Sequence, residues 1–138
     1  MTRLSAALRR AVRQRARERC EYCQSSTLLT GEEFTADHIV PTARGGADAL
    51  DNLCYCCFWC NSYKSAVTVA KDPRTADTVP LFDPRRDDWG DHFRWSPNAT
   101  RIIGRTPVGR ATVKALRLNR ATLVRARKIW VGTGLHPP

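Results

Sequence analysis

The chain has 138 residues and a formal net charge of +10 at neutral pH, with 23 lysines and arginines against 13 acidic residues. This length suits one domain with one modest core. The excess of positive charge points to a polyanionic partner, with nucleic acid first and an anionic membrane surface second. A basic surface that only keeps the protein in solution is the remaining interpretation.

The charge is distributed unevenly along the chain. All acidic residues fall between Glu18 and Asp91, so residues 92–138 contain ten lysines and arginines and no acid. The first nineteen residues contain seven arginines and a single acid. Two basic flanks therefore bracket a balanced middle, an arrangement that suits contacts with phosphate groups.

The sequence predicts neither a membrane span nor a signal peptide. No apolar run approaches the roughly 20 residues that a spanning helix needs. Arg9, Arg10 and Arg13 interrupt the segment where a signal peptide would have its apolar centre. We therefore expect a cytoplasmic protein with no membrane partner. Cysteines stay reduced there, so the six cysteines predict metal ligands before disulfides.

The first half of the chain predicts a helix, a strand and a second helix. Residues 3–19 favour an amphipathic helix, because Leu4, Leu8 and Val12 recur at helical spacing among arginines. Residues 33–40 alternate and are rich in strand formers, which predicts a strand that ends at Pro41. A loop with two glycines follows, and residues 61–66 fit a short helix.

The second half predicts an extended segment, a hairpin and two helices. Residues 71–78 form a turn or loop, and 79–86 form a proline-punctuated extended segment that wraps the core. Residues 92–95 and 101–103 predict two short strands joined by a turn. Thr106 and Pro107 suit the start of a helix over 107–118, and a second helix follows over 120–131. No linker or repeat interrupts the chain. We expect one domain over 1–138, with a motif core at about 20–66 and a basic extension at about 79–138.

Four of the six cysteines have the spacing of a structural zinc site. Two Cys-x-x-Cys pairs separated by 33 residues supply four thiolates, the set that closes a zinc tetrahedron. A second register stays open, because Cys54 and Cys57 also form such a pair and Cys54 could replace Cys60. An iron–sulfur cluster or redox use of one pair are the alternatives. The preferred ligands are Cys20, Cys23, Cys57 and Cys60.

A closed zinc site stabilises structure and leaves the chemistry to other residues. Its expected effect is to fix the segments on either side of Asp37 and His38. The leftover Cys54 and Cys56 are then expected as small buried apolar residues. His92 and His136 have no motif around them. We expect His92 to be a packed histidine and His136 to lie near a frayed end.

The region between the cysteine pairs closely resembles the HNH endonuclease family. The motifs that carry the resemblance are C-x2-C at 20–23, D-H-I-V-P at 37–41, G-G at 45–46, D-N-L at 51–53 and C-x2-C-N-x2-K at 57–64. The resemblance implies an α+β fold, with a small ββα-metal core stapled by zinc. An N-terminal basic helix and a C-terminal hairpin with two helices would flank this core.

The resemblance also implies a role for each motif residue. Asp37 and Asn61 would hold one divalent cation through oxygen atoms, which suits Mg²⁺ or Mn²⁺. Asn61 stands at a position where the family often has histidine. His38 would be the general base that takes a proton from the attacking water. Asn52 would orient the His38 ring through its side-chain or backbone oxygen.

Two basic residues are candidate contacts to the nucleic acid. Lys64 lies one turn into the predicted short helix, and Arg44 lies in the loop before the two glycines. The alternative for Lys64 is an ordinary solvated lysine on a helix surface. The two interpretations of Lys64 stand about level on the sequence alone.

The resulting hypothesis is a metal-dependent endonuclease that hydrolyses DNA, with RNA left open as a substrate. The runner-up is a non-catalytic, zinc-stapled nucleic-acid-binding module. A redox or iron–sulfur protein is the third interpretation. The complete set of Asp37, His38, Asn52 and Asn61 favours the enzyme, because a binding module has no need of it.

Overall fold

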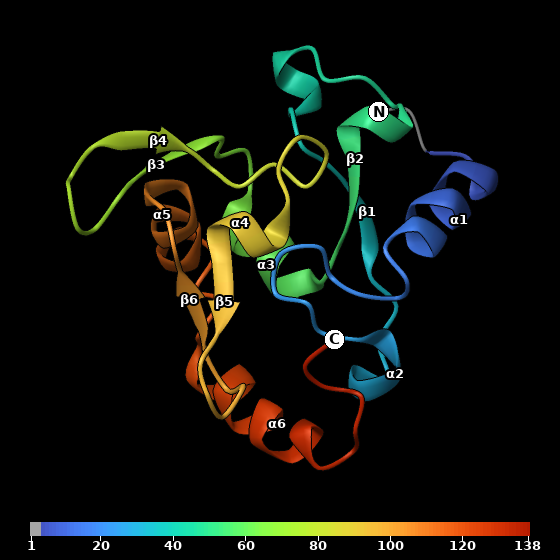
Figure 1. Ribbon diagram of the computed structural model, residues 1–138. Coiled ribbons are helices and arrows are strands. Elements are labelled where there is room, and N and C mark those ends of the chain that lie inside the picture. The colour runs from blue at the N-terminus through green and yellow to red at the C-terminus, as the bar shows by residue number, and fades with distance from the viewer. Residues whose placement is uncertain (1–3) are drawn as a thin grey trace.

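The computed structural model describes residues 4–138. Short helices and three two-stranded sheets alternate along the chain (Figure 1). None of the helices in the described part is long and apolar enough to cross a membrane. The elements are α1 (Ala6–Arg15), α2 (Thr27–Thr30), β1 (Thr35–His38), β2 (Leu53–Cys56), α3 (Phe58–Lys64), β3 (Val69–Lys71), β4 (Thr78–Pro80), α4 (Trp89–His92), β5 (Phe93–Trp95), β6 (Ile102–Gly104), α5 (Pro107–Ala115) and α6 (Ala121–Val131).

The motif residues lie on two antiparallel strands and the helix that follows them. Strands β1 and β2 pair so that Asp37 is opposite Cys54 and His38 is opposite Leu53. All of β2 is buried, and α3 begins directly after it with Cys57 as its N-cap. The predicted strand over 33–40 is therefore shorter, at Thr35–His38, and the predicted short helix begins earlier, at Phe58.

Helix α1 packs its apolar face against the outside of this strand pair. Leu4 and Leu8 join Val12 in a small cluster with Leu53 and Tyr55 of β2, as the helical spacing predicted. Ser5 caps the helix by accepting a hydrogen bond from the backbone N–H of Leu8 at 3.1 Å. The helix is shorter than the predicted 3–19, because residues 17 and 18 have positive φ angles of 54° and 64°. Residue 3 lies outside the described residues.

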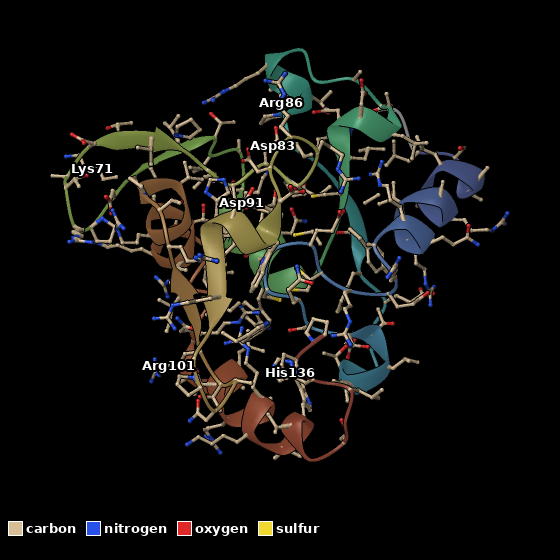
Figure 2. All side chains as sticks on the ribbon, in the orientation of Figure 1. Lys71, Asp83, Arg86, Asp91, Arg101 and His136 are labelled. Atoms are coloured by element: carbon tan, nitrogen blue, oxygen red, sulfur yellow. The ribbon has the colours of Figure 1, made fainter. Side chains whose placement is uncertain are left out.

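The C-terminal elements follow the prediction closely. Strands β5 and β6 form the expected hairpin, and Thr106 caps α5 through a hydrogen bond from the backbone N–H of Gly109 at 3.0 Å. Helix α6 matches the second predicted helix. Strands β3 and β4 form a hairpin that projects as an arm, with Lys71 on it (Figures 1 and 2). The short helices α2 and α4 were not predicted.

One hydrophobic cluster joins the motif region to the C-terminal extension. Both cysteine pairs and Tyr22 pack in it together with buried apolar residues of the second half of the chain. Arg127 of α6 is also fully buried and donates to the carbonyls of Thr100 and Leu118 at 3.0 and 2.8 Å. The buried apolar residues from the second half are Leu81, Phe82, Phe93, Ile102, Leu116, Leu118 and Leu123.

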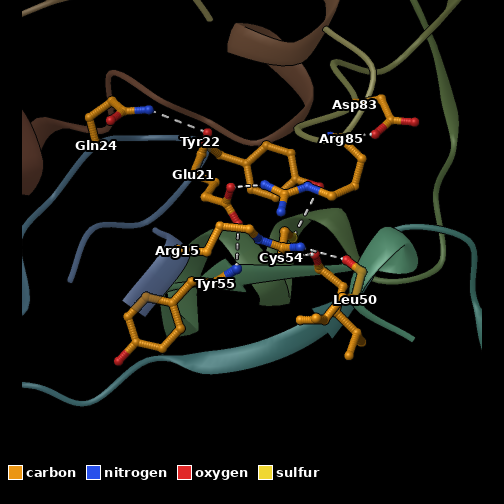
Figure 3. Close-up of polar contacts among 10 residues, drawn as sticks. Arg15, Glu21, Tyr22, Gln24, Leu50, Cys54, Tyr55, Asp83 and Arg85 are labelled. Carbon is orange, nitrogen blue, oxygen red and sulfur yellow. Dashed lines mark hydrogen bonds and ion pairs between the residues drawn. The ribbon is translucent and has the colours of Figure 1, made fainter. Parts of the chain in front are cut away.

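Polar contacts reinforce this junction around the first cysteine pair (Figure 3). Glu21, between the two cysteines, accepts a hydrogen bond from the backbone N–H of Tyr55 on β2 at 2.8 Å and forms an ion pair with Arg85. The indole N–H of Trp89 donates to the carbonyl of Tyr22 at 3.0 Å. The extension after α3 is therefore attached to the motif region and is not a loose tail.

Candidate functional site

The four predicted zinc ligands come together in the structure. The Sγ atoms of Cys20, Cys23, Cys57 and Cys60 all lie within 4.8 Å of one another, and all four residues are buried. The first pair sits in the tight turn before α2, and the second pair spans the first turn of α3. This closed group of thiols could hold a metal ion.

The spacing of the sulfur atoms fits one tetrahedral ion. Four sulfurs at the usual Zn–S distance of about 2.3 Å stand roughly 3.8 Å apart, and Cys23 and Cys57 Sγ are 3.8 Å apart. A cluster of several irons would hold the sulfurs farther apart. Contacts with the other three thiols hold the pKa of Cys23 well below its usual range, whereas burial and contacts within the group raise the pKa values of Cys20, Cys57 and Cys60. A bound cation would therefore have to displace protons from the group.

The structure also selects between the two cysteine registers. Cys54 lies on β2, outside the group of four, and its thiol donates to the hydroxyl of Tyr22 at 3.7 Å. Burial raises the pKa of Cys54 to about 12, which keeps this residue a thiol. Cys56 is likewise fully buried. Both residues are packed as small apolar side chains, as expected.

Arg120, just before α6, contacts the cysteine group from the C-terminal half. Its guanidinium nitrogens lie 3.9 Å from Cys60 Sγ and 3.8 Å from Cys57 Sγ. A guanidinium beside thiolates offsets their negative charge and donates hydrogen bonds to sulfur. This contact could not be predicted from local sequence, because 59 residues separate Cys60 from Arg120.

The carboxylate of Asp37 lies beneath α3, beside Lys64. The Lys64 ammonium is 3.2 Å from Asp37 Oδ2 and donates to the backbone carbonyl of His38 at 3.1 Å. Its approach to Asp37 is an ion pair without hydrogen-bond geometry, so the buried Oδ2 has no hydrogen-bond partner among the described residues. Burial raises the pKa of Asp37, and Lys64 opposes that shift. A carboxylate is the kind of ligand that a hard divalent cation prefers, and in this structure Lys64 already lies beside Oδ2.

The imidazole of His38 is held by Asp48. His38 Nε2 lies 2.6 Å from Asp48 Oδ1, and the His38 side chain is 23% exposed. A carboxylate only accepts hydrogen bonds, so the proton of a neutral His38 ring sits on Nε2 and the ring's other nitrogen is left basic. Asp48 was not among the predicted site residues.

Asn52 has a different partner from the expected one. Its side-chain oxygen accepts from the backbone N–H of Val40 at 2.9 Å, and its amide nitrogen donates to the carbonyls of Val40 and Ala47 at 3.1 and 3.0 Å. The side chain therefore holds the backbone of the loop between the strands, and not the His38 ring. The backbone oxygen of Asn52 accepts from the N–H of Ile39, next to His38, at 2.9 Å.

The two glycines of the motif serve this same loop. Gly45 has a φ of 85°, the left-handed conformation that follows the short helical turn Thr42–Arg44. A Cβ atom on Gly46 would lie 1.8 Å from the carbonyl oxygen of Val40 and 2.8 Å from Asn52 Nδ2. Only glycine fits at position 46, because the hydrogen bonds of Asn52 hold the loop backbone close to it.

Lys64 follows Asn61 by three residues on α3, so the two lie on the same side of the helix. This side faces β1. Asn61 is half-buried and its backbone carbonyl accepts from the N–H of Ser65 at 2.8 Å. The helix therefore places Asn61 one turn before the residue that touches Asp37. The register of α3 is fixed by Cys57 and Cys60, which belong to the cysteine group.

The two predicted phosphate contacts differ in their surroundings. The Lys64 side chain is only 3% exposed and is bound to Asp37 and to the His38 backbone. Neither a solvated lysine nor a surface phosphate contact describes it, because the helix turns this side chain inward. Arg44 is exposed and donates to the Thr68 hydroxyl at 3.0 Å, beside the arm formed by β3 and β4.

Residues 20–66 match the family model of the HNH endonucleases. The HNH segment, as we call residues 20–66, contains β1, β2, α3 and all four clustered cysteines. No curated protein and no solved structure matches the chain. The HNH segment connects the protein with nucleic-acid chemistry, and the region after residue 66 lies outside the match.

Proposed function

We propose that the protein is a metal-dependent endonuclease that hydrolyses phosphodiester bonds in DNA. The observation that carries the proposal is the pairing of His38 with Asp48, next to the buried carboxylate of Asp37, within the HNH segment. A general base and a cation ligand on adjacent residues are what phosphodiester hydrolysis requires.

His38 would act as the general base. Asp48 fixes the ring and keeps the proton on Nε2, so the other ring nitrogen can take a proton from the attacking water. The carboxylate then stabilises the imidazolium that forms. Asn52 supports this step indirectly, because it fixes the backbone directly after His38.

Asp37 and Asn61 would hold the catalytic cation, for which Mg²⁺ or Mn²⁺ is the expected identity. The bound cation would supply stabilisation of the negative charge that develops on the phosphoryl group. Lys64 would keep the Asp37 carboxylate ionised and in place from behind. The four cysteines would hold zinc and fix the helix that carries Asn61.

The expected substrate is DNA, and the charge distribution supports a polyanion. Residues 92–138 contain ten lysines and arginines and no acid. Contacts from such residues to phosphates position an enzyme without specifying a sequence. We also propose that residues 1–138 work as one domain, because the hydrophobic cluster joins the HNH segment to the extension.

Plasmid cleavage in Mg²⁺ or Mn²⁺ tests the proposal. We expect wild-type protein to nick or cut the plasmid and His38→Ala to lower the rate by about 10²- to 10⁴-fold. His38→Ala should keep the wild-type zinc content and unfolding temperature, because the His38 ring lies outside the cysteine group. Cleavage that persists in this variant at the wild-type rate would remove His38 as the base. A wild-type protein that binds DNA and never cleaves it would favour the binding module.

A further inference from the structure

The outward side of α3 carries a row of aromatic rings. Phe58 is 68% exposed and Trp59 is 53% exposed, although both adjoin buried zinc-site cysteines. Their rings meet edge to face with centroids 5.1 Å apart. Trp59 also stacks on Tyr63, one turn later, at 6.0 Å with an interplanar angle of 28°. Exposed aromatic rings on one helix side indicate a binding surface.

Arginines from the C-terminal half cover one end of this row. The guanidinium of Arg117 lies over the Tyr63 ring at 4.8 Å, and that of Arg120 lies at 6.0 Å. Arg120 is engaged by the cysteine sulfurs, whereas Arg117 has no acidic partner in the described part of the chain. The row therefore combines flat rings with a positive charge, as base-binding surfaces do.

The rings open onto a groove between α3 and α6 of about 680 Å³. The groove is larger than an aromatic base and is open along one side. Charged residues from two parts of the chain line it. Arg120 comes from the C-terminal half, and Glu32 and Glu33 come from the segment before β1, where Glu33 pairs with Arg13 at 3.0 Å. The main apolar and aromatic lining residues are Phe34, Phe58, Trp59, Tyr63, Leu123 and Trp130.

We propose that this aromatic groove binds unpaired bases of a DNA strand. Bases would stack on the exposed rings of Phe58 and Trp59, and phosphates would lie near Arg117 and Arg120, whose guanidinium groups cover Tyr63. The two glutamates would repel phosphates from their part of the groove and so favour one path of the strand. A duplex keeps its bases stacked inside, so only an unpaired segment can use these rings.

The proposal rests on the proposed nuclease activity for its link to cleavage. Asn61 and Lys64 face β1, and Trp59 and Tyr63 lie on the other side of the same helix. A helix with its side chains is roughly 10–12 Å wide, a distance that a few nucleotides span. A strand could therefore run from the site around α3 into the groove. The substrate class would be DNA with a single-stranded portion, such as a flap or a gap.

Binding of a labelled mixed-sequence single-stranded DNA, measured by fluorescence anisotropy beside its duplex, tests the groove. The experiment uses the full chain in a His38→Ala background without added Mg²⁺, so that cleavage does not interfere. Trp59→Ala should weaken single-strand binding by about tenfold, with a much smaller effect on the duplex. Arg117→Asn should also weaken single-strand binding. Trp59→Phe should keep most of the affinity that Trp59→Ala loses.

The controls are matched to each change. Ile129→Ala removes another exposed apolar side chain, 75% exposed on α6, and Arg125→Asn removes another exposed arginine of that helix. Asparagine suits position 117, where φ is 50°, so Arg117→Asn should not disturb the backbone. Zinc content and thermal unfolding at the wild-type values show that each variant is folded.

The possible outcomes separate the groove from the nuclease. If Trp59→Ala and Arg117→Asn bind single-stranded DNA as tightly as their control variants do, the proposed role of the groove is overturned, even where the wild type cleaves DNA. If these two variants bind single-stranded DNA more weakly than their controls and the wild type cleaves no substrate, the groove would be supported and the nuclease overturned. Unchanged DNA binding together with loss of a dimer in sedimentation would also overturn the proposal, because the groove would then join two copies of the chain.

Discussion

Among single residues, the proposed base depends most on a carboxylate ten positions away. Asp48 Oδ1 lies 2.6 Å from His38 Nε2, and this contact leaves only one ring nitrogen able to accept a proton. Serine hydrolases use a carboxylate to hold their catalytic histidine in the same manner. Asp48 is therefore a positioning residue with its own testable effect.

Asp48→Asn should lower kcat by at least about tenfold, and by less than His38→Ala does. An amide can donate to Nε2 and so favours the wrong tautomer of His38. KM and DNA binding should change little, since Asp48 acts through His38. Steady-state cleavage of a defined DNA substrate measures both parameters. Asp51→Asn is the matched control, because Asp51 is exposed in the same loop. Asp48→Glu keeps a carboxylate and should recover part of the kcat that Asp48→Asn loses. Full activity of Asp48→Asn, or a kcat of Asp48→Glu no higher than that of Asp48→Asn, would contradict the positioning role of Asp48.

Gly46→Ala should lower cleavage and stability together. Its Cβ would lie 1.8 Å from the Val40 carbonyl oxygen, so the loop that Asn52 holds has to move. Overpacking of this kind costs about 1–3 kcal/mol, and the shift reaches the backbone next to His38. Gly90→Ala is the control, because nothing lies within 4 Å of the added Cβ there. Denaturant unfolding and the cleavage assay give the two readouts. A Gly46→Ala protein as stable and active as Gly90→Ala would show that the loop tolerates a Cβ atom beside the Val40 carbonyl.

For single residues, the sequence predicted which side chains lie at the candidate site better than it predicted their contacts. Cysteine spacing was enough to predict which four cysteines lie together, because four thiols at that spacing have few alternative uses. The partner of Asn52 and the inward turn of Lys64 depend on side-chain directions set by the folded loop and by the register of α3. Asp48 could have been suggested by being the one acid between the two glycines and Asp51.

Among the elements, helix α3 carries the largest share of the proposed sites. Its first turn supplies Cys57 and Cys60, its inner side supplies Asn61 and Lys64, and its outer side carries Trp59. Seven residues are too few for a stable isolated helix. The position of α3 therefore depends on the cysteine group, and the proposed cation ligand Asn61 depends on it in turn.

Cys60→Ser should abolish zinc binding and cleavage together. The loss leaves three ligands and releases α3, and structural zinc sites contribute directly to folding. Cys54→Ala is the comparison, because Cys54 is also buried and belongs to the same hydrophobic cluster but lies outside the group of four. It should keep one zinc per chain and lose only modest stability. Elemental analysis of purified protein measures the metal. Loss of zinc in Cys54→Ala with zinc retained in Cys60→Ser would reverse the ligand register.

The elements with strong local signals were predicted, and the shortest ones were not. Helix α5 has a capping threonine and a first-turn proline, and α5 and α6 both have regular apolar spacing, which are properties of the local sequence. The four-residue helices α2 and α4 have too few residues to show a period. Strand β2 has no alternation, because all of its residues are buried, so its pairing with β1 could not be inferred from pattern alone.

Across the whole molecule, the C-terminal segment closes over the core. His136 was expected near a frayed end, and that expectation is wrong. The residue is 4% exposed, its Nε2 lies 2.8 Å from the Ala99 carbonyl oxygen, and its ring packs against Trp95 at 4.6 Å (Figure 2). The aromatic neighbours and the carbonyl come from segments far away in sequence, which explains why local composition did not reveal the packing.

His136 should make stability depend on pH in the mildly acidic range. Burial lowers the pKa of His136 in the folded state, with Arg127 and Arg19 adding to the shift. The unfolded chain therefore binds the proton more readily, so the contribution is complete above the unfolded pKa of about 6.5 and is lost as pH falls below it. Urea unfolding at several pH values between neutral and mildly acidic measures this slope.

His136→Asn removes the titrating group, so its free energy of unfolding should fall less steeply over that pH range than that of the wild type. Acid release of metal from the cysteines affects both proteins equally and cancels in the difference. Identical slopes for the two proteins would show that His136 does not carry this dependence. A steeper slope in the variant would contradict the direction of the shift.

The contact between Arg120 and the cysteine sulfurs has a consequence for biosynthesis. A ribosome releases Cys20 and Cys23 first, Cys57 and Cys60 next, and Arg120 only after a further 59 residues. The nascent chain can thus gather its four thiols and capture an ion while the C-terminal half is still being made. Arg120 would then arrive last, beside a site that could already hold its ion. On this order, zinc supply during translation would decide how much of the chain matures, because an ion offered afterwards would meet four cysteines that the finished fold has buried.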